Sequence, residues 1–401
     1  RSNSEIWYLL GEVYLKLGDI DKSIYCYATA IRYDSQNELP RIALENTLIE
    51  YKQIDDPIRK KYADYHFQQG LEFIDRNYAA QARNEFRRGL LIDPHSTEGK
   101  KLYAGLMKTA GYLNKYLSML ENIASEIPDD MDLVDEVEIY QSIISDTVSE
   151  RWGIDQFLIE VPKYNVELFL GKSGILYNTF NEGVHLGSYL IHTLHGYENI
   201  EANFNAYPSD FFTAYRTARD KDSDYFLIFD FRDTKRSFSA EVRIYHSGTG
   251  SLLMEIPIFR TGNQKIGFSL QLLSKTLSES LPKWSEIIER KFNRVLLNVG
   301  NIQGTNEGDI FLVIREDDFR LKKDSIGLDF NPDLLLGEVE ITKTDDLVSE
   351  GTLRKYQFFD MINPGDYLIK KTESMVFPEN DENMVKQALP VDLYKSIISI
   401  P

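Results

Sequence analysis

The segment WYLLGEVYLKLGDIDKSIYCYATA, residues 7–30, carries the pattern that indicates how the N-terminal third folds. Small and large apolar residues recur at helical spacing on both sides of a short turn at Gly18 and Asp19. Small residues let two helices cross closely, and large apolar residues fill the space beside the crossing. The segment therefore predicts a helical hairpin.

The same pattern returns twice downstream. The second copy comprises Gly70, Phe73, Ala82, Phe86, Gly89 and Pro94, and a weaker third copy comprises Tyr103, Ala104, Met107, Gly111, Leu120, Ile123 and Pro128. Pro94 and Pro128 are 34 residues apart, the period of a helix-turn-helix repeat. The pattern resembles the tetratricopeptide repeat. This resemblance implies a helical stack whose concave surface binds another protein.

Residues 1–151 are expected to be helical throughout. Stop signals such as Asp56-Pro57, an N-cap followed by a first-turn proline, set the boundaries. The expected helices are 4–17, 20–33, 38–53, 58–76, 78–92, 97–110, 113–126 and 131–150. The last is interpreted as a capping helix. The repeat spacing leaves 38–53 either as an unpaired helix or as a degenerate repeat.

The composition narrows the possible partners. A chain of 401 residues predicts two or three domains, and a net charge of -18 argues against nucleic acid or acidic lipid as partner. The single cysteine, Cys26, excludes an internal disulfide or a cysteine-built metal cage and is expected to be buried. No apolar run approaches the roughly 20 residues of a membrane span. No signal peptide is recognisable, but because the chain opens on Arg1 without an initiator methionine, this says little about its compartment.

The remaining chain predicts an α/β domain over 152–281 and a small β-barrel over 282–375. In the first, we expect helices at 183–195, 208–220 and 266–280 and strands at 197–204, 224–233, 237–246 and 251–259. In the second, short strands are separated by turns rich in Gly and Asn. Gly308-Asp309 and Gly365-Asp366 each precede a strand, where glycine would supply a positive φ. Residues 376–401 form a tail of uncertain structure.

Three runs in the expected barrel carry a wider resemblance: RVLLNVGNIQGTNEGDIFLVIRE (294–316), LGEVEITKTDDLVSEG (336–351) and INPGDYLIKK (362–371). They resemble the C-terminal barrel of the flagellar assembly protein T family. Residues 155–280 are similar to the adaptor domains of that family and of CsgG and TolB-type periplasmic proteins. The resemblance implies a periplasmic or envelope-associated bacterial protein, and spirochaete periplasmic proteins share this composition of modules.

Candidate chemical motifs are incomplete. Gly171-Lys172-Ser173-Gly174 ends like a phosphate-binding loop but has Val166 where the loop needs glycine. Asp230 and Asp233 are expected to lie on an exposed, charge-paired strand face. His192 and His195 have metal-binding spacing, but no third ligand is near in sequence. We therefore expect no catalytic residue, metal or cofactor, and we rank an enzyme third among the possible functions.

The tetratricopeptide resemblance implies which residues of the concave face bind protein: Tyr8, Glu12, Leu15, Asp64, Phe67, Leu71, Ile74, Asp75, Lys101 and Lys108. The alternative is that these residues pack against the next repeat or another domain. The leading hypothesis is a non-enzymatic envelope scaffold, in which repeats and C-terminal modules hold different proteins or further copies of the chain, around a flagellar or secretion-type machine. The runner-up is a small-ligand or peptidoglycan-binding α/β domain with the repeats as an oligomerisation arm.

Overall fold

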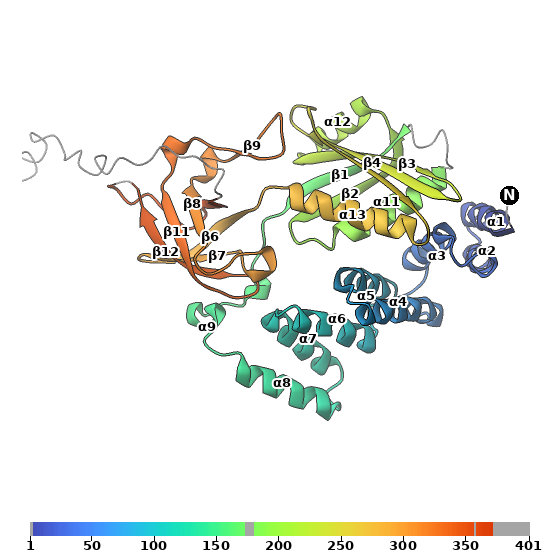
Figure 1. Cartoon of the computed structure of the whole chain (residues 1–401), viewed down its shortest axis with the longest axis horizontal. Helices are drawn as coiled ribbons and strands as arrows, with labels where there is room; N and C mark the ends of the chain where they lie inside the picture. The colour runs from blue at the N-terminus through green and yellow to red at the C-terminus, as the bar shows by residue number, and fades with distance from the viewer. Residues whose placement is uncertain (1–2, 173–179, 357, 372–401) are drawn as a thin grey trace, which may run out of the picture.

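The computed structural model describes residues 3–172, 180–356 and 358–371, so the predicted tail 376–401 lies outside the described residues. Three parts follow one another along the chain: helical repeats, an α/β domain and a closed barrel (Figure 1). The predicted fold class is confirmed. The N-terminal helices are α1 (Asn3–Lys16), α2 (Ile20–Tyr33), α3 (Glu38–Tyr51), α4 (Pro57–Asp75), α5 (Ala79–Ile92), α6 (Thr97–Thr109), α7 (Leu113–Glu126), α8 (Met131–Ile143) and α9 (Val148–Trp152).

The repeat helices pair through the small residues of the pattern. Gly11 of α1 lies against the ring of Tyr27 of α2, and Gly70 of α4 lies against the ring of Phe86 of α5. Asp56 caps α4 by accepting a hydrogen bond from the Ile58 amide. Local sequence therefore sets both the helix ends and the hairpin crossings. Cys26 is buried and free, as expected.

In this region the structure favours one of the two alternatives for 38–53 and changes one expectation. Within the described chain, α3 has no hairpin partner of its own and packs against α2 and α11, so it is an unpaired helix. The expected capping helix 131–150 is wrong as a single element. It divides into α8 and α9 around Asp146, whose φ is 56°, because Thr147 and Glu150 form a capping box that starts a new helix.

The α/β domain is built on a five-stranded sheet in the order β2-β1-β3-β4-β5. β1 is parallel to β2 and β3, while β3, β4 and β5 are antiparallel. Helices α11 and α13 pack on one face and α12 on the other. The elements are β1 (Tyr164–Gly171), α11 (Phe180–Leu194), β2 (Ile200–Ser209), α12 (Phe211–Asp220), β3 (Tyr225–Asp233), β4 (Ser237–His246), β5 (Leu252–Thr261) and α13 (Lys265–Ser280).

The barrel closes in the order β11-β12-β7-β6-β13-β8. Gly308 and Gly365 have φ values of 86° and 95°, so the expectation of positive φ at both turns is confirmed. A two-stranded ribbon, β9 with β10, accompanies the barrel. The strands are β6 (Trp284–Lys291), β7 (Arg294–Leu297), β8 (Ile310–Ile314), β9 (Arg320–Leu321), β10 (Leu328–Asp329), β11 (Gly337–Thr344), β12 (Ser349–Lys355) and β13 (Tyr367–Lys370).

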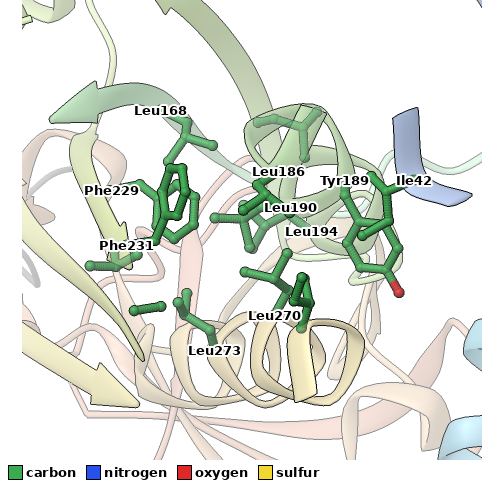
Figure 2. Packing of buried hydrophobic residues seen from close by; sticks show 14 of the residues in the cluster. Ile42, Leu168, Leu186, Tyr189, Leu190, Leu194, Phe229, Phe231, Leu270 and Leu273 are labelled. Atoms are coloured by element: carbon green, nitrogen blue, oxygen red, sulfur yellow. The ribbon is translucent and has the colours of Figure 1, made fainter. Parts of the chain in front are cut away.

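One hydrophobic core runs from the first repeat helices into the α/β domain. It joins buried residues of α1, α2 and α3 to the sheet and to α11 and α13. Figure 2 shows the contact: Ile42 of α3 lies beside Tyr189 of α11, while Leu190 and Leu270 point toward the sheet residues. The first repeats and the α/β domain therefore share one continuous hydrophobic core, although the sequence places them in separate domains.

Candidate functional site: the inner face of the repeats

The repeats meet the α/β domain through a surface that we call the inner face, made of Glu12, Ile42, Asn46, Phe73 and Arg88. The following contacts place α11 and α13 directly on it. Asn46 donates a hydrogen bond of 3.0 Å to the carbonyl of His185, and the ring of Phe73 lies 6.0 Å from that of Phe268. The chain's own α/β domain therefore covers the inner face.

Glu12 shows how a predicted partner-binding residue is used inside the chain. Its carboxylate lies 2.9 Å from His185 Nε2 and accepts hydrogen bonds from the Tyr27 hydroxyl at 2.7 Å and from Asn181. Burial opposes the ionised form, but the hydrogen bonds and the charge of His185 lower the pKa of Glu12 below its usual value. Glu12 thus ties α1 to α11.

Other predicted binding residues are scattered. Tyr8 is buried in the shared core, and Phe67 is buried between repeats against Gly89 and Gly99. The expectation that these two residues and Glu12 line an accessible binding surface is therefore corrected. Large side chains at helix crossings and domain contacts are buried by packing inside the chain. Leu15 and Leu71 are half-buried, and the exposed residues of the set are Asp64, Ile74, Asp75, Lys101 and Lys108.

Two of the exposed residues already have intrachain partners. Lys101 pairs with Asp130 at 2.7 Å, and Lys108 pairs with Glu136 at 3.1 Å. Both contacts join α6 to the start or the middle of α8. The predicted set therefore does not form one continuous groove.

A buried charged cluster lies behind the inner face, and the sequence interpretation missed it. His66 of α4 sits between two carboxylates, with Nε2 2.8 Å from Glu45 and Nδ1 2.7 Å from Glu85. Arg88 of α5 also donates to Glu45, and its guanidinium lies 4.0 Å from the centre of the Tyr189 ring. Through Tyr189 the cluster reaches α11.

The charges in this cluster support one another. Burial would raise the pKa of Glu45, but Arg88 and His66 lower it to about 2. Burial likewise opposes a charged imidazole, but Glu45 and Glu85 raise the pKa of His66 above its ordinary value of 6.5. Because both ring nitrogens face carboxylates, the charged form can donate from both. These buried ionic contacts hold α3, α4 and α5 in a fixed arrangement.

A cavity of about 290 Å³ opens beside the cluster, between the repeats and α13. Its lining includes Arg41, Tyr65, Gln69, Phe268 and Gln271. The Arg41 guanidinium lies 3.7 Å from the centre of the Tyr65 ring, so the wall combines charge with aromatic surface. Glu38 closes one side by accepting hydrogen bonds of 2.8 Å from the Ile266 and Gly267 amides at the start of α13.

The chemical motifs considered in the sequence have structural roles where they are described. Lys172 pairs with Asp210 at 2.8 Å, while Ser173 and Gly174 lie outside the described residues. Asp230 pairs with Arg243 and Asp233 with Lys265, and both aspartates are half-buried, not exposed as expected.

His192 and His195, which have metal-binding spacing in the sequence, do not share a contact in the structure. His195 Nε2 lies 2.8 Å from the Ala202 carbonyl, and burial together with Arg88 lowers the pKa of His192 to about 4. Over residues 3–172, 180–356 and 358–371 there is no group of three or more His, Cys, Asp or Glu side chains that could hold a metal ion. Nor does any helix in that part of the chain have the length and apolarity needed to cross a membrane.

The charged cluster predicts a pH dependence. A raised pKa means that the stability from charged His66 is fully present below pH 6.5 and is lost as the pH rises through the raised pKa. We expect the free energy of unfolding to fall over this upper range in wild type and to vary less in His66→Gln. His192, whose lowered pKa reduces stability below pH 6.5, is common to both chains. Urea denaturation from pH 5 to 9 measures the difference, and parallel curves would contradict it.

Comparison with known proteins places two segments. Residues 4–37 match the tetratricopeptide repeat model, and residues 163–279 match the model described as the second domain of the TPASS_0648 family. No curated protein matches the chain. The chain thus contains a tetratricopeptide repeat at its N-terminal end.

Solved structures are similar over parts of the chain. The TPR protein TTC0263 of Thermus thermophilus is 20% identical, with 34% of this chain and 81% of that chain covered and a TM-score of 0.18. The PelC dodecamer of Paraburkholderia phytofirmans is 15% identical, with 29% of this chain and 86% of that chain covered and a TM-score of 0.24. TolB of Acinetobacter baumannii is 9% identical, with 49% of this chain and 48% of that chain covered and a TM-score of 0.24. The tetratricopeptide repeat, together with the stacked helices, supports a protein–protein interaction scaffold.

Proposed function

We propose that this chain is a non-enzymatic scaffold that assembles or stabilises a machine of the bacterial cell envelope. The observation that carries the proposal is the use of the inner face. Tetratricopeptide helices are built to hold protein, and here they hold the chain's own α11 and α13. The repeats thereby fix the α/β domain, while their remaining exposed surfaces are free to serve partners.

The barrel is attached to the same frame. Trp152 of α9 donates a hydrogen bond of 2.7 Å from Nε1 to Glu350 of the barrel, and the Lys115 amide of α7 donates one of 2.7 Å to Asp346. Two adaptor-like modules are therefore held by one helical support, as suits a protein that presents several surfaces at once. The envelope setting, and a flagellar or secretion-type machine within it, rest on the resemblance of residues 294–371 to the flagellar assembly protein T barrel.

The exposed side of α4 is the first surface to test. Asp64, Ile74 and Asp75 combine an apolar side chain with two carboxylates, which suits an amphipathic segment with basic flanks. In crosslinked pulldowns from envelope extracts, Asp64→Lys/Asp75→Lys should lose part of the captured proteins, and more at low salt because screening acts within about 8 Å at physiological ionic strength.

A matched control separates this from a general charge effect. Asp129 and Asp132 are exposed acids of the same repeat region, and their double reversal to lysine should leave the captured set unchanged. Equal capture by wild type and the Asp64/Asp75 variant at every salt concentration would remove this surface from the proposal.

A second candidate function is binding of a small ligand or a peptidoglycan fragment, with the repeats as an oligomerisation arm. The cavity of about 290 Å³ favours a ligand site at the boundary between the α/β domain and the repeats, because aromatic walls beside Arg41 and Gln69 suit a ligand with both polar and apolar groups. Soluble peptidoglycan fragments should then raise the melting temperature of wild type and not that of Arg41→Ala. Identical melting curves with and without fragments would dismiss this candidate.

A further inference from the structure

A second cavity lies where the three parts of the chain meet. It has a volume of about 280 Å³, and none of the described residues that line it lines the cavity beside the charged cluster. Its wall is shared by α5, α6 and α7 of the repeats, by the turn between α11 and β2, and by the start of the barrel, which supply Arg83, Tyr103, Lys115, Tyr197 and Trp284, respectively. The cavity therefore exists only while the repeats, the α/β domain and the barrel are docked on one another.

Two arginines of α5 place positive charge at this cavity. Arg83 lines it, and Arg87 lies one turn further along the helix, where a Cβ on the lining residue Gly196 would collide with Nη1 of Arg87. Like charges four residues apart on a helix repel each other. Burial lowers the pKa of Arg87, and the charge of Arg83 lowers it further against the opposing effects of Tyr103 and Tyr197. The surroundings of the pair therefore do not favour its two positive charges.

No carboxylate of the described residues forms an ion pair with these arginines. Within that part of the chain Arg83 has neither a hydrogen bond nor an ion pair, and Arg87 donates a hydrogen bond of 3.4 Å to the His192 carbonyl. The acids among the described lining residues are Glu198 and Glu279, and each pairs with a lysine, at 2.6 Å and 3.7 Å. Two arginines without a carboxylate partner, in a chain of net charge -18, point to an anionic occupant.

The rest of the wall is largely apolar and aromatic. It includes Tyr103, Met107, Pro162, Pro282 and Trp284. Ligand sites combine such a wall with a few polar groups that orient the ligand, and their volumes run from about 300 to 1,000 Å³. A cavity just below this range fits one small ring system and one charged group. The arginine guanidinium matches the oxygens of a carboxylate through two parallel hydrogen bonds.

We propose that this cavity binds a small amphipathic organic anion, with an apolar ring system against the aromatic wall and a carboxylate or similar oxyanion on Arg83 and Arg87. Because the lining comes from all three parts of the chain, such a ligand would bind only their docked arrangement and would stabilise it. The site adds a ligand to the proposed scaffold and does not depend on which proteins the scaffold holds.

Two dyes that differ by one charged group test how the anion is recognised. 8-Anilino-1-naphthalenesulfonate carries a sulfonate as the oxyanion, and N-phenyl-1-naphthylamine has the same ring body without it. Both should bind the 401-residue chain saturably in fluorescence titrations. Arg83→Met should weaken binding of the sulfonate dye by about tenfold, the scale of a hydrogen bond to a charged group, and that of the uncharged dye by less than about twofold. Arg216→Met is the control and should change neither, since the Arg216 side chain is 86% exposed on α12.

Tyr103→Ala tests the apolar wall. It should weaken both dyes by a similar factor, because they share the ring body, whereas Tyr33→Ala at an exposed tyrosine of α2 should weaken neither. Circular dichroism should show the same helix content in every variant. The proposal is overturned by a lack of saturable dye binding, by wild-type affinity of Arg83→Met for the sulfonate dye, by an equal loss of both dyes in Arg83→Met, or by unchanged binding in Tyr103→Ala. None of these outcomes affects the pulldown of envelope proteins, so the two proposals are tested separately.

Discussion

Replacing Glu45 by alanine should lower the free energy of unfolding by about 3–5 kcal/mol, because it removes the buried carboxylate that Arg88 and charged His66 share. Glu45 and His66 are almost completely buried, so solvent compensates for only part of the attraction that is lost. Urea denaturation at pH 7 measures the change.

Glu50 provides the control on the same helix. It lies on the exposed side of α3, and Glu50→Ala should change the free energy of unfolding by less than about 0.5 kcal/mol. His66→Gln combined with Glu45→Ala should recover part of the loss, because it removes one of the two positive charges that lose their contact with Glu45. If Glu45→Ala is as mild as Glu50→Ala, the charged cluster does not support the fold.

Gly70→Ala should destabilise the chain by about 1–3 kcal/mol, although alanine favours a helix more than glycine does. A Cβ at this position would lie 2.2 Å from Cε1 of the Phe86 ring, and Phe86 is itself buried on all sides. The ring cannot withdraw without opening the crossing of α4 and α5. The measured effect is again the free energy of unfolding in urea.

Gly105 isolates the packing effect. It lies within α6, and a Cβ added there would meet no described atom of another helix or strand within 4 Å, so Gly105→Ala gains helix propensity without a clash. It should raise the free energy of unfolding by about 0.5–1 kcal/mol. The two substitutions should therefore differ in sign. A stabilising Gly70→Ala would show that the repeat crossing is loose.

Local signals determine much of what the sequence could predict. Asp56-Pro57 starts α4 where it was expected, and the pattern of small and aromatic residues gives the correct hairpins, because caps and close crossings depend on neighbours in the chain. The break between α8 and α9 also had a local signal. Thr147 and Glu150 have capping-box spacing, and the apolar periodicity of 131–150 concealed it.

The use of each helix face could not be predicted in the same way. Glu12 and Asp64 are both acidic residues at positions that the repeat pattern assigns to a binding surface. Glu12 is buried against His185, while Asp64 is exposed. The difference arises because α11, which lies about 170 residues after Glu12 in the sequence, packs against Glu12 and not against Asp64. Similarly, Glu45, His66 and Arg88 come from three helices. They come together through tertiary packing, which the apolar periodicity of one helix does not predict.

The central claim is that the α/β domain occupies the inner face of its own repeats. A photo-crosslinking residue, p-benzoylphenylalanine, in place of Gln69 tests it directly, because Gln69 lines the cavity together with Phe268 and Gln271 of α13. The same probe in place of exposed Glu72 is the control. Irradiated in native envelope extract and analysed by mass spectrometry, the probe at 69 should link to a peptide of α13 in the same chain. Links from position 69 to other proteins, with none to α13, would contradict the account.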